Sequence, residues 1–381
     1  MTVTTVFSYL PAYTPKGDLN LSLGSTSELL MLLAAMAYSV TFVVFAYDLV
    51  RSSQTIRDIE KSLVKEEKRA LAAAAAGKGT AGNVTPGSVA VAERDESDTE
   101  RDTERVRHRN ATVDGQLVDD DMDYDEKAPT RRLARVAIAL MWLSFAIHAA
   151  AVVTRSIAAQ RVPWGNMYEF MTTGALVVVA VYLVALMIKD IRFMGVFVSG
   201  LVVAMMCSAT MAFPTPVQHL QPALQSPWLI IHVSIAVLAC ALFTLKFAMA
   251  VLQLIQSRRQ AALLAGREDK LPWLRLVPSA VTLENVAYRI NAVAFVAWTL
   301  TLILGAVWAN EAWGRPWGWD TKEVWTFIIW VVYAGYLHAR ATRGWTGDRS
   351  AWLSIIGYGC IIFNFTVVNT VFAGLHSYAG I

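Results

Sequence analysis

The stretch YEFMTTGALVVVAVYLVALMI, residues 168–188, carries a single charged side chain, that of Glu169. A helix of about 20 mostly apolar residues is long enough to cross the ~30 Å hydrocarbon core of a bilayer. Lipid offers no hydrogen-bond partner for exposed backbone groups, so a run of this kind crosses only as a helix. The stretch therefore predicts a transmembrane helix.

Further apolar runs of sufficient length lie on either side of it, at 28–49, 134–154, 194–213, 228–254, 286–307, 324–340 and 351–373. The chain of 381 residues is 55% hydrophobic and 17% charged, and its mean hydropathy is +0.43. Soluble domains carry about 25% charged residues, so the composition excludes an ordinary cytosolic enzyme. The predicted fold class is all-α, a polytopic membrane helix bundle with about eight transmembrane helices in contact with membrane lipid. The net charge of +3 is small and gives no indication of a nucleic-acid partner.

The distribution of basic residues predicts the orientation, because cytoplasmic loops are enriched in Lys and Arg. With the N-terminus outside, the inner loops contain the basic-rich tract Arg51–Arg135 and most of the other basic residues. The outer side then contains only Lys16, Arg155, Arg161, Arg315 and Lys322. Both termini are therefore predicted to be extracytoplasmic, in a multi-pass protein of the cytoplasmic membrane.

The apolar runs and charged tracts predict four regions. Residues 1–27 form an extracytoplasmic leader, and residues 28–50 form the first transmembrane helix. Residues 51–133 are charged and poor in aromatics, which favours a largely disordered cytoplasmic linker that begins with a helix-prone stretch, Ile56–Ala76. Residues 134–381 are predicted to form a seven-helix domain.

Five tryptophans gather in an outer segment, residues 305–325, that reads GAVWANEAWGRPWGWDTKEVW. Interfacial aromatic belts offer one explanation, since Trp favours the headgroup level. The glycines between the indoles favour another, because glycine allows close approach and flat indoles make a platform for a planar apolar ligand. A sugar, a quinone or another planar ligand fits such a platform. Asp320, Lys322 and Glu323 add polar groups at one edge.

The run Trp313-Gly-x-x-Trp317-Gly-Trp319-Asp320-x-Lys322-Glu323-x-Trp325 resembles the "WWD" signature of CcsA/ResC-type cytochrome c biogenesis proteins, the haem-handling proteins of system II. Further motifs of that family occur in order along residues 134–381. They are Asn166-Met-Tyr-Glu169, Pro222-Ala-Leu-Gln-Ser226 with Trp228-Leu-x-x-His232, Tyr336-Leu-His338 and Gly374-Leu-His376-Ser-Tyr378. The resemblance implies a haem-handling domain with a WWD segment at 308–325.

Two histidines are predicted at the depth of the tryptophans. His232 lies near the outer end of the fifth span, and His376 follows the eighth. A neutral imidazole is a common axial ligand of haem iron, although either residue can also be a polar interfacial histidine. The resemblance implies that His232 and His376 are the axial ligands of an outer haem b. It also implies that the haem platform consists of Trp313, Trp317, Trp319, Trp325 and Asp320.

A third histidine, His338, lies 13 residues beyond Trp325, and thus ~20 Å deeper along one helix. It cannot share the outer haem, and by position alone it can also be a snorkelling interfacial residue. The resemblance implies that it is the ligand of an inner haem whose other ligand comes from a CcsB/ResB-type partner. His148 is predicted to be a core histidine hydrogen-bonded between helices. His219, in the loop before His232, is a weaker candidate for the outer iron.

The resemblance implies a role in which haem enters near His338, moves to the outer platform and is presented to the Cys-x-x-Cys-His segment of apocytochrome c, as part of a holocytochrome c synthase. The chain contains no Cys-x-x-Cys pair, so a thioredoxin-like thiol reductant is an expected partner. Arg315 and Lys322 are candidates for the haem propionates from charge alone. A b-type haem electron carrier and a haem or solute exporter are the alternatives, although no span contains the two histidines typical of the first.

Overall fold

A computed structural model describes residues 19–77, 112–113, 116–117, 131–221, 224–342 and 345–376. The main elements are α1 (Leu21–Gly77), α3 (Arg132–Ala159), α4 (Met167–Ile188), α5 (Gly195–Ala212), α6 (Pro227–Leu264), α7 (Ala280–Trp313), α8 (Thr321–Ala341), α9 (Asp348–Phe365) and α10 (Val367–Val371). Two short 3₁₀ helices, η3 (Arg192–Met194) and η5 (Pro272–Leu276), join α4 to α5 and α6 to α7. An antiparallel pair of two-residue strands, β1 (Thr112–Val113) and β2 (Gln116–Leu117), completes the described elements.

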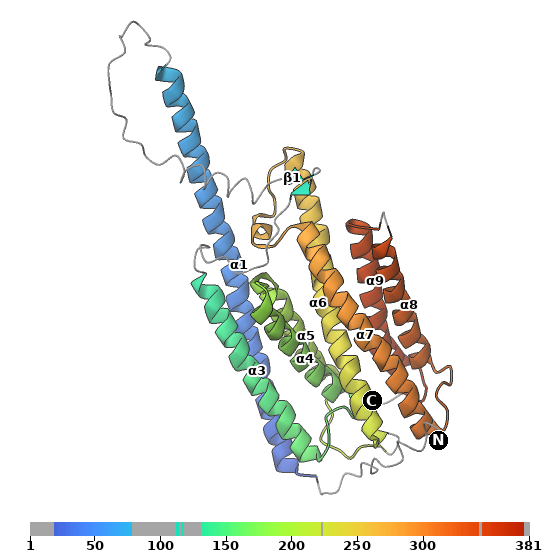
Figure 1. The fold of residues 1–381 in the computed structure, drawn as a ribbon. Coiled ribbons are helices and arrows are strands. Elements are labelled where there is room, and N and C mark those ends of the chain that lie inside the picture. Colours follow the sequence, from blue (N-terminus) through green and yellow to red (C-terminus); the bar gives the residue numbers. More distant parts are fainter. Residues whose placement is uncertain are drawn as a thin grey trace.

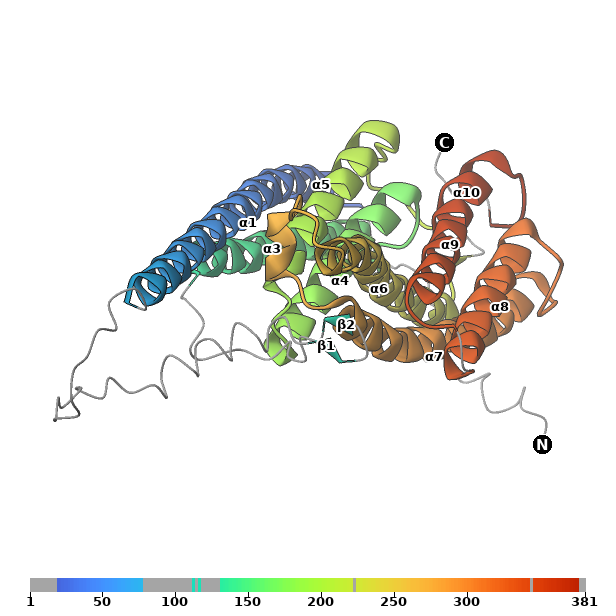
Figure 2. The same ribbon diagram turned by 90° about the horizontal axis from the view of Figure 1, so that it is seen from above.

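The long helices run alternately up and down (Figure 1). Helices α1, α3, α4 and α5 pack with parts of α6 and α7 around one core cluster, and α6, α7, α8 and α9 pack around a second. The view from above shows α1 and α3 on one side of the molecule and α8 and α9 on the other, with α4 and α6 between them (Figure 2). The starts of α4, α6 and α8 and the end of α7 therefore meet at one end of the bundle, which the basic residues predict to be extracytoplasmic.

Seven of the described helical segments are long and apolar enough to cross a membrane. They are Leu21–Thr55, Arg132–Ala159, Met167–Ile188, Arg192–Ala212, Pro227–Leu264, Ala280–Trp313 and Asp348–Val371. The remaining predicted span, 324–340, corresponds to α8, whose Trp, Tyr, His and Arg side chains make it less apolar. The prediction of a polytopic all-α membrane bundle is confirmed.

Helix α1 continues well beyond the first predicted span. It contains 57 residues, which correspond to a length of about 86 Å, and it extends past the other helices at the end opposite to the starts of α4, α6 and α8 (Figure 1). The helix-prone stretch Ile56–Ala76 is thus the end of α1. Residues 78–111, 114–115 and 118–130 of the predicted linker lie outside the described residues.

Side-chain caps determine where several helices begin. Asn166 accepts a hydrogen bond from the Glu169 amide at the start of α4, and Ser226 and Ser279 cap α6 and α7 in the same way. Asp320 and Glu323 form a capping box at the start of α8. Each cap satisfies an amide that the helix itself leaves without a partner.

A buried ion network ties the loops together at the end where these helices begin. Glu169 is 0% exposed, and its carboxylate accepts hydrogen bonds from Arg155 Nε at 3.0 Å and from Arg161 NH1 at 2.7 Å. The two guanidinium groups in turn donate to the backbone oxygens of Thr215 and Gln218, in the segment between α5 and α6. The network therefore connects the end of α3, the start of α4 and the segment before α6.

Replacing Glu169 with Gln is expected to destabilise the protein by about 3–5 kcal/mol, because it leaves two buried guanidinium groups without a counter-charge. The free energy of unfolding in detergent micelles measures this loss. The exposed Glu268 provides the control, since Glu268→Gln should change stability by no more than about 0.5 kcal/mol. Equal stability of the two variants would contradict the structural role of the network.

Candidate functional site

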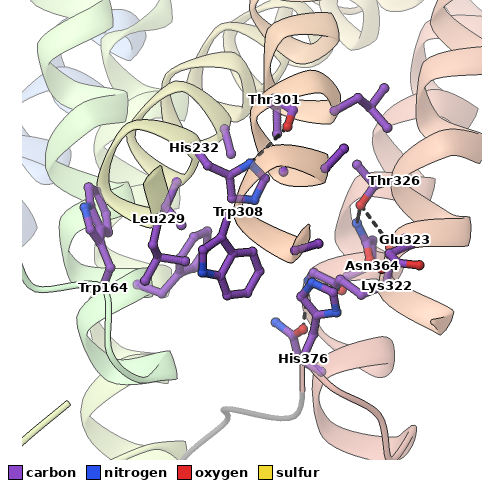
Figure 3. A pocket seen from close by; sticks show the side chains of 18 of the residues that line it. Trp164, Leu229, His232, Thr301, Trp308, Lys322, Glu323, Thr326, Asn364 and His376 are labelled. Atoms are coloured by element: carbon purple, nitrogen blue, oxygen red, sulfur yellow. Dashed lines mark hydrogen bonds between the residues drawn. The ribbon is translucent and has the colours of Figure 1, made fainter. Parts of the chain in front are cut away.

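A cavity opens at the end of the bundle where α4, α6 and α8 begin (Figure 3). Its volume is about 180 Å³. Helices α4, α6, α7, α8 and α9 all contribute to the wall, and apolar and aromatic side chains form most of it. The polar residues of the wall are Asn166, His232, Thr301, Lys322, Glu323, Thr326, Asn364, Asn369 and His376.

His232 enters the cavity from the first turns of α6. Its Nδ1 lies 2.9 Å from the backbone oxygen of Thr301 on α7. Gly305, one turn further along α7, makes this approach possible, since a Cβ at that position would lie 2.8 Å from His232 Cε1. The imidazole is therefore fixed between two helices by a hydrogen bond and a close backbone contact.

His376 reaches the same cavity from the segment that follows α10. Its Nδ1 lies 2.6 Å from Asp320 Oδ2, and the Leu375 amide donates to Asp320 Oδ1 at 3.2 Å. One carboxylate at the start of α8 thus holds the two residues at the C-terminal end of the described chain. The structure brings His232 and His376 to one cavity from positions 144 residues apart in the sequence.

Trp308 of α7 lies between the two imidazoles. Its indole is stacked on His232, with 5.9 Å between ring centroids and an angle of 15° between planes. His376 meets the same indole edge-on at 5.5 Å. Trp308 is 2% exposed, so a flat aromatic ring already occupies the space between the two histidines.

The hydrogen bonds of the two histidines determine which ring nitrogen carries the proton. A backbone oxygen and a carboxylate both accept hydrogen bonds, so each Nδ1 is the donor. In the neutral imidazole this leaves the lone pair on Nε2. Metal-binding histidines in proteins commonly show this arrangement, in which the second nitrogen donates to a carbonyl or a carboxylate. In both residues, therefore, the neutral imidazole carries its acceptor lone pair on Nε2.

The structure brings only part of the predicted tryptophan platform to the site. Trp317 lines the cavity, and Trp313 contacts His376 at 4.8 Å between centroids. Trp319 is 79% exposed and has a φ of +57°, a left-handed conformation that is uncommon for a bulky residue. Trp325 packs against Phe363 of α9. Trp308 and Trp164, which were not among the predicted platform residues, line the cavity.

The polar residues predicted at the edge of the platform, Asp320, Lys322 and Glu323, form hydrogen bonds within the site. Glu323 Oε2 accepts hydrogen bonds from the amides of Gly318 and Asp320. The hydrogen bond from His376 holds the pKa of the Asp320 carboxyl below its ordinary value. Lys322 Nζ donates to the Asn364 backbone oxygen at 2.9 Å and to Asn369 Oδ1 at 2.7 Å.

The other histidines lie elsewhere. His338 is exposed near the end of α8, away from the cavity. His148 is 0% exposed in the first helix group, where its ring meets Tyr38 edge-on at 5.7 Å. His219 is exposed in the segment between α5 and α6. These positions agree with the predicted separation of His338 from the outer pair.

Several cavity residues were missed by the sequence analysis. Trp164 and Asn166 come from the α3–α4 connection, whereas Asn364 and Asn369 come from α9 and α10. The sequence Asn166-Met-Tyr-Glu169 has the spacing of a helix cap followed by an acidic third residue, a signal that could have placed the start of α4. Nothing comparable marks the asparagines of α9 and α10, which reach the cavity through tertiary packing.

The fold and the cavity together define an integral, multi-pass membrane protein with a histidine-bearing aromatic site at one end of its bundle. Residues 164–376 match the family described as cytochrome C assembly protein. This range runs from Trp164 to His376, two residues of the cavity wall. The chain belongs to this family.

Proteins similar in sequence support the same family assignment. The chain is 36% identical over 255 residues to the cytochrome c biogenesis protein CcsA of Synechococcus elongatus, with 57% of this chain and 78% of the relative covered. It is 35% identical over 241 residues to CcsA of Guillardia theta, with 59% and 79% covered. The chain is thus of the CcsA type, as the WWD resemblance predicts, and a bacterial plasma membrane agrees with its cyanobacterial relatives.

Replacing Asp320 with Asn should release His376 without unwinding the start of α8, because Asn caps helices as well as Asp does. The lowered pKa of Asp320 means that its ionised form is the one stabilised. In the wild type the contact is therefore present above the ordinary carboxyl pKa and is lost as the pH falls through the lowered pKa. NMR of ¹⁵N-labelled histidine should detect this acid transition in the wild type and not in Asp320→Asn. The same transition in both proteins would contradict the assignment.

Proposed function

We propose that this protein takes part in cytochrome c biogenesis by holding haem b in the cavity and presenting it for covalent attachment to apocytochrome c. The observation that carries the proposal is the pair His232 and His376, which face one aromatic cavity with both Nδ1 atoms bonded to acceptors. Membership of the cytochrome c assembly family supports the same role.

The chemistry of the cavity wall suits an iron porphyrin. A porphyrin is planar and largely apolar, and here the walls are flat aromatic rings and aliphatic side chains. The Nε2 atoms of His232 and His376 would bind the iron on its two faces. Trp308, whose indole contacts both imidazoles, would have to move to admit a ligand between them.

The attachment needs no nucleophile from this chain. The two thiols of a Cys-x-x-Cys-His segment add across the vinyl groups of haem, so that each sulfur forms a bond to carbon and its hydrogen goes to the other vinyl carbon. When haem is bound, His232 and His376 would hold its iron until the histidine of that segment could take over one of the two positions. The protein supplies orientation of the cofactor, whereas the reduced thiols depend on a separate, thioredoxin-like reductant.

An inner haem site near His338 is the second part of the proposal. His338 is exposed on α8, ~20 Å from the level of Trp325 along the same helix. An exposed histidine at a helix face can bind an iron whose other ligand is supplied by a second protein. The CcsB/ResB-type partner is the proposed source of that ligand, and haem would pass from this site to the outer cavity.

His232→Ala and His376→Ala should each lower haem content at the outer site by roughly ten-fold or more, the loss that follows even when a hydrogen-bond partner of a metal ligand is removed. Absorption spectra of the purified protein should show loss of the six-coordinate low-spin form, and added imidazole should restore it. His219→Ala is the matched control because His219 is exposed and outside the cavity. Unchanged haem content in the double variant would refute the ligand pair.

His338→Ala should remove the inner haem while the outer haem keeps its spectrum, because the two sites lie at different depths of the bundle. The measurement is haem content after co-purification with the CcsB/ResB-type partner. Thr342→Ala, an exposed polar change at the same end of α8, should leave both haems in place. An inner haem that survives His338→Ala would show that its ligands lie elsewhere.

A further inference from the structure

Two residues of the cavity wall near the start of α4 carry buried hydrogen-bond donors. Trp164 Nε1 and Asn166 Nδ2 are inaccessible to solvent, and neither has a hydrogen-bond partner among the residues that the structure describes. Asn166 as a whole is 4% exposed. A buried donor without a partner is unfavourable, so two of them on neighbouring residues of the wall of a ligand cavity indicate a group that the ligand supplies.

The orientation of the Asn166 amide follows from its role as a cap. Its Oδ1 accepts a hydrogen bond from the Glu169 amide at 2.9 Å, which places oxygen toward the helix and leaves the NH₂ group as the donor on the other side. The same amide lies at the N-terminus of a helix of 22 residues. The partial positive charge of a helix N-terminus favours an anion there.

The buried side chains next to Trp164 and Asn166 carry a net positive charge. The buried network contains two guanidinium groups, Arg155 and Arg161, and the carboxylate of Glu169, which gives a net formal charge of +1. Arg161 lies directly under the backbone between Trp164 and Asn166, since a Cβ on Gly165 would be 2.8 Å from Arg161 NH1. A buried positive charge of this kind favours a counter-anion nearby.

We propose that Trp164 Nε1 and Asn166 Nδ2 form a carboxylate subsite that binds a propionate group of the porphyrin. The inference rests on the proposed haem-binding function. Both residues belong to the wall of the cavity that contains His232, and Figure 3 shows Leu229 between Trp164 and the imidazole. A carboxylate there accepts hydrogen bonds from both donors and faces the net charge of the network beneath.

The two basic residues of the WWD segment are poorer partners for this carboxylate. Lys322 Nζ already donates to two oxygens of α9 and α10, and it lies 4.6 Å from the centre of the Phe365 ring. Arg315 is exposed beside Gly318, outside the cavity wall. The donors of the α3–α4 connection are therefore the ones that the ligand's carboxylate would satisfy.

The test compares haem b with its dimethyl ester, in which the carboxylates are neutral, by titration into the purified full-length protein. Wild type should bind haem b more tightly than the ester. Asn166→Asp keeps the capping oxygen and replaces the donor with a negative charge, and Trp164→Phe removes the Nε1 donor and keeps an aromatic ring. Each variant should weaken haem b binding by roughly ten-fold or more, the value of a hydrogen bond to a charged group, and should bind the ester as wild type does.

Binding of the ester with the six-coordinate spectrum shows that each variant is folded, and Arg315→Gln is the control for a general loss of positive charge. Equal binding of haem b and the ester by wild type would overturn the carboxylate subsite while the histidine ligands stand. The carboxylate subsite would also be overturned if Asn166→Asp and Trp164→Phe still bind haem b more tightly than the ester. It would be overturned as well if Arg315→Gln no longer does so. Failure of wild type to bind either compound would instead refute the haem-binding function itself.

Discussion

The hydrocarbon core of a membrane offers no partner for an unpaired backbone group, and the rest of this structure depends on that constraint. The chain crosses as helices, so irregular backbone is confined to the two ends of the bundle. Irregular backbone is also where side chains can cap helices and approach one another from different segments. The cavity therefore forms at an end, where α4, α6 and α8 begin and α7 stops at Gly314, which has a φ of +70°.

Two residues that cap helices also contribute to the polar part of the cavity. Asp320 caps α8 and accepts the hydrogen bond from His376. Asn166 caps α4 and leaves its amide nitrogen at the cavity wall. Because capping fixes these side chains before any ligand is present, the imidazole and the amide need little ordering when a ligand binds. This reduces the entropic cost of binding.

The helical membrane bundle could be predicted from the sequence because a long apolar run can cross a bilayer only as a helix. The predicted span boundaries placed His232 and His376 at one level, and the family motifs implied a common role as ligands. Positions that depend on local backbone and packing could not be predicted. The left-handed φ of Trp319 turns its indole outward, and the register of α8 directs Trp325 toward α9. The stacking of Trp308 on His232 depends on the packing of α7 against α6, which no motif specifies.

The cavity joins the two helix groups of the fold, and this has a consequence for how a ligand acts on the protein. Both histidines come from the second group and its C-terminal extension, whereas Trp164 and Asn166 come from the α3–α4 connection of the first. Phe170 of α4 and Phe365 of α9 stack at 4.7 Å beside the same space. A planar ligand held by imidazoles on one side and by amide and indole donors on the other would cross-link the groups. Its release would then require that contacts to both groups loosen.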